Sequence, residues 1–517
     1  MLAFYVFPLL SIASLALSSD AQQIPIDSHG PDADNTAISK RVAIIGAGIA
    51  GVSATYLLRE RYKSRLGIDI TVYEAASQVG GRVKSVQVYD GAYGSQHVEV
   101  GAPTFYSDDT CLQAAIDEVG LRQKLVPHYP RKKRVGVWDG QSFILHREKD
   151  LKSTTWRDLV RSIWRYGLSP CRLHDLVAEK LPQMKKLCGA SQTVNRNIPE
   201  TLDMLGLTAE QMHSAANYLR NNSISSDFSK DVIQATARAW FAHDLDDLNG
   251  LAALVAMNPA DTDSIHVGNH RLIYRLLKLS EAEIHLNTRV TQIKRSDHGT
   301  LHLTVTTREL PDHSSNTETA EYDAIIIATP LQGAGLELDL AVHVTDALTP
   351  YVERHVTHFT SPISHTLSPS FFNVSTAEEI PDKIFTTRGI ASDPGFFSID
   401  SSFASLGVEG CLVKSENLYR LVTAAPLEDG FVAKLLGKPQ NSTLAELGVR
   451  WIHPQSWPYA SPRLSNAALL DNIEIADGVF YTGAGEEVVS SLEMSCRMGQ
   501  LAAKLLYYSR WAPELEV

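Results

Sequence analysis

The sequence predicts an α/β protein with a Rossmann-type domain, discontinuous in the sequence, and a second, α+β domain. Two short apolar runs, residues 41–45 and 68–73, flank a stretch of helical composition. Two further strand patterns lie far along the chain, at residues 322–330 and within residues 473–500, and a helical pattern follows the last one. Strands that alternate with helices are typical of a parallel sheet covered by helices.

The first of these segments contains a glycine pattern between strand and helix. Residues 41–45 are almost wholly apolar, as in a strand buried on both faces, and lead directly into Gly46-Ala47-Gly48-Ile49-Ala50-Gly51. Residues 52–62 have helical spacing, and the second apolar run ends at Glu74, 23 residues after Gly51. The glycines alone are a weak signal, but the complete βαβ unit predicts a dinucleotide site.

Each glycine of the pattern has a predicted role. Gly46 makes the tight turn, Gly48 lets a pyrophosphate approach the backbone, and Gly51 lets helix and strand pack closely. The helix N-terminus at Ile49 and Ala50 offers N–H groups and partial positive charge to phosphates. A tight turn without a ligand is the alternative interpretation.

Glu74 and the loop after it indicate which dinucleotide binds. Glu74 is expected to bind the ribose hydroxyls of an adenosine and to repel a 2′-phosphate, which leaves FAD and NAD. The loop Ser77-Gln78-Val79-Gly80-Gly81-Arg82 resembles the second signature of glutathione-reductase-type FAD proteins, notably the amine oxidases. In those proteins it lies against the FAD phosphates and ribityl chain. We therefore predict FAD, with an ordinary surface turn as the alternative for this loop.

Composition limits the classes of partner. The chain is 44% hydrophobic and 21% charged, as is usual for a soluble globular protein. Its net charge of −12 and pI of about 5.8 argue against nucleic acid, because phosphate binding needs a basic face. The short basic cluster Arg131-Lys132-Lys133-Arg134 is interpreted as a solvated loop.

The N-terminus has the pattern of a secretory signal peptide. Residues 1–21 combine an apolar stretch with small residues, and residues 22–40 form a polar, flexible linker. Residues 1–21 contain no Lys or Arg, so an uncleaved anchor is the alternative; no later segment reaches the roughly 18 apolar residues of a spanning helix. N-x-[ST] sequons at Asn221, Asn373 and Asn441 are compatible with a secretory route, to a secreted or lysosomal/vacuolar destination, although such sequons are common by chance.

The five cysteines are too few and too scattered for a disulfide scaffold or a zinc site. One bridge is compatible with an oxidising compartment, and the region of Cys171 and Cys188 is one place for it. The odd number leaves at least one thiol free or paired outside the chain.

The chain divides into alternating segments. We predict an FAD-binding domain from residues 41–110, 264–335 and 465–517, a mainly helical substrate domain at 111–263, and a β-rich substrate domain at 336–464. Residues 283–287, 289–295 and 301–307 are expected to form a meander of strands. An apolar stripe at residues 151–187 predicts core packing; the alternative is a substrate channel or contact with a membrane surface.

Three further positions resemble flavin-contacting segments of these FAD proteins. Glu99-Val100-Gly101-Ala102 resembles the segment beneath the flavin ring, where Gly101 leaves room for the flat ring, and Val290 stands where adenine meets the backbone. A helix expected from about Ser490 would point its N-terminus at the flavin N1/O2 edge. Glu486 would lie near ribityl or phosphate groups, or else be a solvated turn residue.

Several short segments resemble the prenylcysteine oxidase family, also called prenylcysteine lyase. They are Trp164-Arg165-Tyr166-Gly167, Trp457-Pro458-Tyr459-Ala460-Ser461-Pro462, Glu486, Ser491-Leu492-Glu493-Met494-Ser495 and Tyr508-Ser509-Arg510-Trp511. The resemblance is strongest at both ends and thin between about 190 and 460. In that family a secreted or lysosomal FAD protein splits farnesyl- or geranylgeranyl-cysteine into cysteine, a prenyl aldehyde and hydrogen peroxide.

The resemblance implies hydride transfer from the prenyl C1 to flavin N5, with molecular oxygen as the second substrate. The resulting cation is allylic and flanked by sulfur, so water can add without a strong base, and the hemithioacetal then collapses. The reaction needs a dry apolar cavity and one mild proton acceptor. The sequence shows no nucleophilic triad or metal-ligand cluster, and it assigns no catalytic residue.

Arg238 is the only candidate for the substrate carboxylate, because it lies where the family has such an arginine. The residues after it depart from the family pattern, and a surface arginine is the alternative. Two other functions stay open: an FAD oxidase of another lipophilic substrate, such as a prenylated secondary metabolite or an amine, and a non-catalytic FAD carrier. No Ser-Gly-Gly-Cys sequence for covalent flavin occurs, although Cys496 is near the expected place.

Overall fold

The computed structural model describes residues 39–62, 67–91, 96–127, 134–147, 164–187, 197–266, 268–296, 301–308, 315–341, 349–388, 393–406, 414–465 and 469–512. Several predictions lie outside these residues: the signal peptide, the linker up to residue 38, the basic cluster at 131–133, residues 151–163 of the apolar stripe, Cys188 and Cys411.

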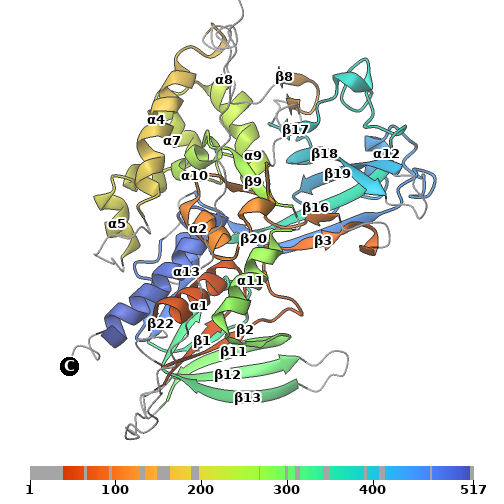
Figure 1. Cartoon of the computed structure of the whole chain (residues 1–517). Coiled ribbons are helices and arrows are strands. Elements are labelled where there is room, and N and C mark those ends of the chain that lie inside the picture. Colours follow the sequence, from red (N-terminus) through yellow and green to blue (C-terminus); the bar gives the residue numbers. More distant parts are fainter. Residues whose placement is uncertain are drawn as a thin grey trace, which may run out of the picture. The chain divides into compact units, whose positions relative to one another are not determined.

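The first predicted strand belongs to a six-stranded sheet, in which it is the third strand in spatial order (Figure 1). The sheet is parallel except at β21, which runs antiparallel to β22. The side chains of Val42, Ile44 and Ile326 are fully buried because both faces of the sheet are covered. In spatial order the strands are β10 (Glu283–His285), β2 (Ile68–Tyr73), β1 (Lys40–Ile45), β14 (Ala324–Ile327), β22 (Val479–Tyr481) and β21 (Glu474–Ala476).

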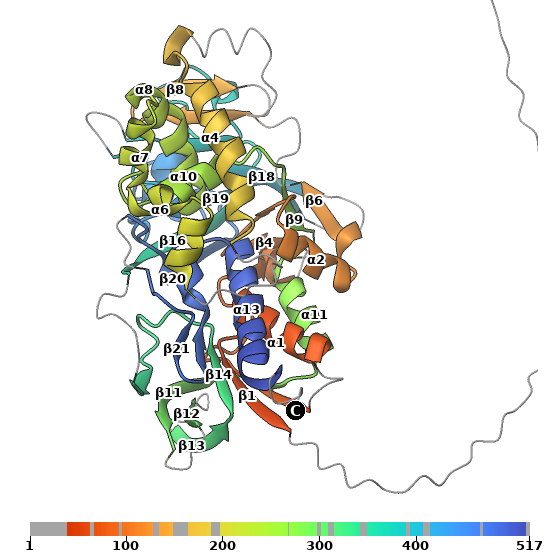
Figure 2. The same ribbon diagram turned by 90° about the vertical axis from the view of Figure 1, so that its left-hand side faces the viewer.

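Helices cover one face of this sheet and a second sheet covers the other (Figure 2). The helices are α1 (Ile49–Tyr62), α11 (His270–Ser280) and α13 (Leu492–Leu506). Gly499 of α13 packs directly on α1, since a Cβ there would lie 2.0 Å from the Ala50 carbonyl oxygen. The second sheet has the order β13 (Ser315–Tyr322), β12 (Leu301–Arg308), β11 (Thr288–Arg295) and β15 (Glu337–Asp339).

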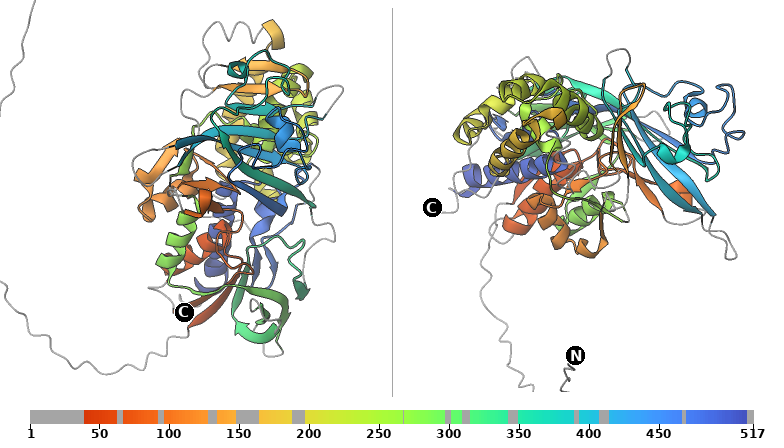
Figure 3. Two further views of the ribbon diagram at one scale, coloured as in Figure 1. Left: turned by 90° about the vertical axis from the view of Figure 1, so that its right-hand side faces the viewer. Right: turned by 90° about the horizontal axis from the view of Figure 1, so that it is seen from above.

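A seven-stranded sheet forms the second domain, with a group of helices beside it (Figure 3). Its strands are, in order, β20 (Ile452–Pro462), β16 (Tyr351–Pro362), β19 (Lys414–Thr423), β18 (Ser398–Leu406), β17 (Lys383–Thr386), β7 (Val135–Trp138) and β8 (Phe143–Arg147). The helices are α4 (Ser169–Met184), α5 (Ile198–Met204), α6 (Thr208–Met212), α7 (Ala215–Asn221), α8 (Ser226–Phe228), α9 (Ala235–Phe241) and α10 (Gly250–Ala256).

The remaining elements are short. They are β3 (Ser85–Gln87), β4 (His97–Glu99), β5 (Phe105–Tyr106), β6 (Leu125–Pro127), β9 (Thr262–Ile265), α2 (Thr110–Glu118) and α12 (Phe431–Leu435). Among the described residues, no helix has both the length and the apolar character needed to cross a membrane.

The predicted fold class is confirmed, and two details differ from expectation. The strands β10, β11 and β12 do not form one meander, because β10 pairs in parallel with β2 while β11 and β12 belong to the second sheet. The segment 111–263, which we predict to be mainly helical, also contributes β7, which pairs in parallel with β17 and so joins the seven-stranded sheet. Strand pairs so far apart in sequence leave no local signal.

The apolar stripe divides between core and surface. Leu173, Val177 and Leu181 of α4 are buried in the main hydrophobic core, as predicted. Trp164 and Leu168 are instead 88% and 57% exposed.

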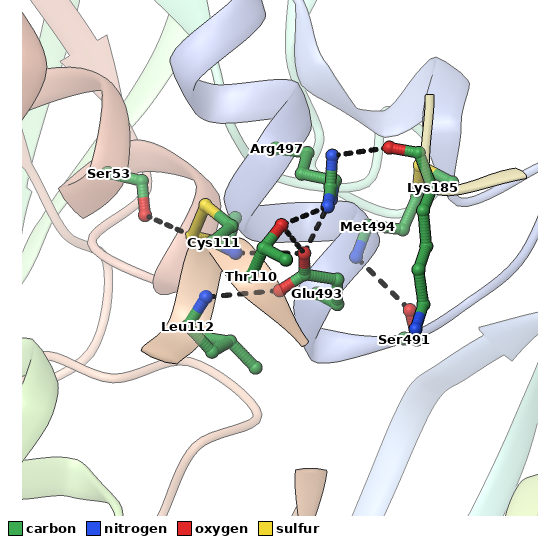
Figure 4. Close-up of a disulfide and its surroundings, with 10 residues drawn as sticks. Ser53, Thr110, Cys111, Leu112, Lys185, Ser491, Glu493, Met494 and Arg497 are labelled. Carbon is green, nitrogen blue, oxygen red and sulfur yellow. Dashed lines mark hydrogen bonds and ion pairs between the residues drawn. A yellow bond between two sulfur atoms is a disulfide. The ribbon is translucent and has the colours of Figure 1, made fainter. Parts of the chain in front are cut away.

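A disulfide joins α2 to α13 (Figure 4). It links Cys111 to Cys496, 385 residues apart, so the expectation of a bridge near Cys171 is wrong; Cys171 is free and exposed. Beside the bridge, the Glu493 carboxylate accepts hydrogen bonds from the N–H groups of Cys111 and Leu112, at 2.9 and 3.0 Å. The first turn of α2 is thus capped by a residue of α13.

Candidate functional site

A cavity of about 710 Å³ lies where the two domains meet. Its walls come from the carboxyl ends of β1, β2 and β14, from the first turn of α13, and from α9, β16, β19 and β20 of the second domain. In parallel α/β sheets, ligands bind at the carboxyl ends of the strands. Cavities of about 300–1,000 Å³ are typical of ligand and cofactor sites.

The glycine loop lines one end of this cavity. Gly46 has a φ of +103°, and a Cβ there would lie 2.7 Å from the Ala328 carbonyl oxygen, so the turn requires glycine. No protein atom would lie within 4 Å of a Cβ on Gly48, which faces the cavity with Ile49 and Ala50. Space is therefore left where a pyrophosphate would approach the helix N-terminus. Gly51 does not line the cavity; a Cβ there would lie 2.0 Å from the Gly46 oxygen, as close packing predicts.

Glu74 and Val290 lie at the same end. The Glu74 carboxylate accepts hydrogen bonds from the N–H of Ala47 through Oε2 and from that of Ala76 through Oε1, both at 2.9 Å. These bonds hold it against the glycine loop, where it lines the cavity. Burial raises the pKa of Glu74, although both N–H groups act in the opposite direction. Val290, on β11, forms part of the wall beside it.

Arg82 and Glu486 both line the cavity and form an ion pair with each other. Arg82 also donates to the Ala460 carbonyl oxygen at 3.0 Å. Glu486 accepts from the Tyr351 hydroxyl at 3.0 Å and from the Ser495 hydroxyl at 3.3 Å. Glu486 is only 7% exposed, so the interpretation as a solvated turn glutamate is wrong.

The glycine pair before Arg82 makes room for the loop. Gly80 and Gly81 have φ values of +124° and +54°, and both line the cavity. Gly101 lines the cavity as well. This position requires glycine because of neighbouring protein atoms, and not only because of a flavin ring. A Cβ there would lie 1.9 Å from the Arg82 carbonyl oxygen and 3.2 Å from the Trp457 side chain.

The last helix presents its N-terminus to the cavity. α13 begins at Leu492, not at Ser490, and the Ser491 hydroxyl caps it by accepting from the Met494 N–H at 3.1 Å. Ser490, Ser491 and Leu492 line the cavity, so the positive end of the helix dipole faces it.

The second domain supplies an apolar wall that carries a cation. Trp240, Phe241, Val356 and Val422 line it, together with Arg354 and, on β19, Arg420. The Arg354 guanidinium donates to the Ala242 and Glu353 carbonyl oxygens at 2.7 Å each, which leaves Nη2 without a partner among the residues that the structure describes. Burial lowers the pKa of Arg354 to about 10, so it stays charged at neutral pH.

Arg238 does not lie on the cavity wall. It is 2% exposed, and it donates to Asp244 at 2.6 Å, Thr386 at 3.0 Å and the Phe396 carbonyl oxygen at 3.1 Å. It is neither a surface arginine nor placed to meet a substrate carboxylate. Sequence reasoning missed Arg354, since only the pairing of β16 into the sheet brings it to the cavity.

The described residues contain no group of three or more His, Cys, Asp or Glu that could hold a metal ion. The fold and the cavity, with its open glycine loop and paired Arg82 and Glu486, instead define an oxidoreductase of the flavoprotein class.

Comparison with known protein families identifies the family to which the chain belongs. A model described as prenylcysteine lyase matches residues 150–517, and one for an NAD(P)-binding Rossmann-like domain matches residues 44–119. The chain belongs to the prenylcysteine lyase family, as the resemblance predicted.

Individual relatives match nearly the whole chain. A farnesylcysteine lyase of Arabidopsis thaliana is 22% identical over 97% of this chain and 93% of its own. A "Prenylcysteine oxidase 1-like" protein of Mus musculus is 25% identical over 98% of this chain and 96% of its own. A solved putrescine oxidase mutant, 15% identical, shares the fold with a TM-score of 0.54 over 91% of this chain and 99% of that one.

Gly48→Leu tests the cofactor end of the cavity. Because a side chain there meets no protein atom but enters the cavity, we expect an intact fold and flavin affinity weakened about tenfold or more, which is ~1.4 kcal/mol or more. The measurements are the 450-nm-region flavin absorbance of the purified protein and thermal unfolding of the flavin-free forms. Undiminished flavin in the variant would contradict the assignment.

Proposed function

We propose that this protein is an FAD-dependent thioether oxidase that cleaves prenylated cysteine into a prenyl aldehyde, cysteine and hydrogen peroxide. Family membership supports the proposal, and the observation that carries it is an apolar wall that holds the Arg354 guanidinium, on the cavity that the glycine loop also lines. A prenyl chain and an amino-acid carboxylate are the two parts of such a substrate.

The residues that line the cavity beside the six-stranded sheet fit FAD along its length, from the adenosine to the flavin ring. Gly46, Gly48, Ile49 and Ala50 would hold the pyrophosphate and Glu74 the adenosine ribose, with Val290 beside adenine. Gly80, Gly81, Arg82 and Glu486 would surround the ribityl chain, and Gly101 would lie near the ring. When bound, the flavin would accept the hydride of the prenyl C1 at N5 and pass the electrons to oxygen.

The second domain would bind and orient the substrate. Trp240, Phe241, Val356 and Val422 would exclude water from the prenyl chain, and each buried CH₂ contributes ~0.8 kcal/mol before ordering costs. Arg354 would hold the carboxylate by a charge-assisted hydrogen bond. A cationic amine is disfavoured as substrate, because Arg354 and Arg420 both line this cavity.

The purified protein tests this function by its visible spectrum. We expect a yellow protein whose flavin bands bleach when farnesylcysteine is added without oxygen and return in air with peroxide. Farnesol, which lacks sulfur and carboxylate, is the control and should leave the spectrum unchanged. A flavin reduced by dithionite but by no prenylcysteine would favour the FAD carrier instead.

A double-mutant cycle between Arg354 and the substrate tests the carboxylate contact. Arg354→Met is expected to weaken binding of farnesylcysteine about tenfold to 100-fold, ~1.5–3 kcal/mol for a charged hydrogen bond. The methyl ester of farnesylcysteine should bind the unmodified protein more weakly than the free acid does, by the same factor. The Arg354→Met variant should bind the acid and the ester about equally. Equal losses for acid and ester would show that Arg354 does not meet the carboxylate.

We further propose that the chain follows the secretory route. The disulfide between Cys111 and Cys496 supports an oxidising compartment, and Asn221, Asn373 and Asn441 are all exposed. Exposed Trp164 and Leu168 would suit peripheral contact with a membrane surface.

Expression of the chain with its own N-terminus in a eukaryotic host tests the secretory route. We expect a glycosylated protein whose mass falls after treatment with endoglycosidase. Unglycosylated protein in the cytosol would contradict the route.

A further inference from the structure

A histidine hidden behind the cavity wall is hydrogen-bonded to a serine on it. His243, in the turn after α9, and Ser461, near the end of β20, approach to 2.8 Å between Nε2 and Oγ. His243 is 1% exposed and Ser461 8%, and only Ser461 lines the cavity. Of this hydrogen-bonded pair, Ser461 is therefore the member that lines the cavity.

The surroundings keep this imidazole neutral. Burial lowers the pKa of His243 to about 3, and the charges of Arg354 and Arg463 act in the same direction. Its Nδ1 is buried and has no hydrogen-bond partner among the described residues. A neutral imidazole can accept the proton of a neighbouring hydroxyl through Nε2.

The proposed reaction needs one proton acceptor at this wall. After the prenyl C1 has lost a hydride, and with it two electrons, to the flavin, a water oxygen bonds to C1 and must release a proton. The C–S bond then breaks as the new hydroxyl releases its proton to water and becomes the aldehyde, and the cysteine sulfur takes up the first proton, so that one proton is released overall. No other atom changes its oxidation state.

We propose that Ser461 is the catalytic residue that takes the proton of this water, and that His243 is its positioning residue. The inference rests on the proposed function. The water proton passes to Ser461 Oγ while the serine proton passes to His243 Nε2. As the C–S bond breaks, the imidazolium returns that proton to the serine oxygen, and the serine passes its own proton to the sulfur.

Substrate binding would make this pair more basic. Arg354, which we expect to hold the substrate carboxylate, is one of the two guanidinium groups that lower the pKa of His243. A bound carboxylate offsets that positive charge, and so raises the pKa of His243 only when an acidic substrate is in place. Recognition and proton transfer are thereby coupled through one arginine.

Other protic groups on the wall are less suited. Lys84 donates to Gln455 Oε1 at 3.1 Å, and an ammonium group has no lone pair with which to accept a proton. Glu486 already pairs with Arg82 and accepts from Tyr351 and Ser495. Ser461 is a wall hydroxyl that a neutral imidazole backs directly.

Anaerobic single turnovers of the holoenzyme with farnesylcysteine test the proposal. In Ser461→Ala we expect flavin bleaching within about twofold of the unmodified rate but aldehyde release slowed about 100-fold or more, the usual contribution of general acid–base catalysis. His243→Gln should slow aldehyde release about tenfold. Ser456→Ala, exposed on the same strand, is the matched control and should change neither step.

Histidine resonances give a second readout that does not depend on turnover. In holoenzyme reduced beforehand, which cannot oxidise its substrate, farnesylcysteine should shift the His243 ring nitrogens, identified by their loss in His243→Gln. The methyl ester should shift them less, because it cannot neutralise Arg354.

The outcomes separate this inference from the proposed function. If farnesylcysteine fails to bleach the unmodified enzyme, the proposed function falls first. If the unmodified enzyme bleaches and releases aldehyde but Ser461→Ala slows both steps equally, or neither, the role of Ser461 is wrong. Flavin content and spectrum like those of the unmodified protein certify that each variant is folded.

Discussion

The ion pair between Arg82 and Glu486 holds the site together. Its two residues are 404 positions apart, one after the glycine pair and the other before the last helix. Through Tyr351 and the Ala460 carbonyl oxygen the same network reaches β16 and β20 of the second domain. Buried charges are stable only when paired and hydrogen-bonded, so this network has few alternative geometries. The network therefore connects the loop that contains Arg82, the turn before α13, and the strands β16 and β20 around one cavity.

The cavity divides chemically along its length. Backbone N–H groups and a helix N-terminus line the end at the six-stranded sheet, which suits a phosphate-bearing cofactor. Aromatic and aliphatic side chains with Arg354 line the end at the seven-stranded sheet, which suits an amphipathic acid. Ser461, with His243 behind it, lies on the wall that β20 contributes to this cavity.

Two arginines show how far sequence reasoning reached. Arg238 and Arg354 both lie over the ring of Phe397, at 4.7 and 4.9 Å, yet only Arg354 faces the cavity. The family resemblance indicates Arg238, on α9, whereas no sequence pattern marks Arg354, on β16. The Arg238 guanidinium is held inside the protein by Asp244, Thr386 and the Phe396 carbonyl oxygen, whereas the pairing of β16 with β20 brings Arg354 to the cavity wall.

The sequence by itself determined the βαβ unit, its glycine turn, Glu74 and the segments that return to the first domain, because each is specified by residues within a few turns of chain. Tertiary structure alone decided the bridge between Cys111 and Cys496, the entry of β7 into the seven-stranded sheet, and the meeting of Arg354, His243 and Ser461. These contacts join residues far apart in the chain. Their geometry follows from packing of whole sheets and helices, which no local pattern encodes.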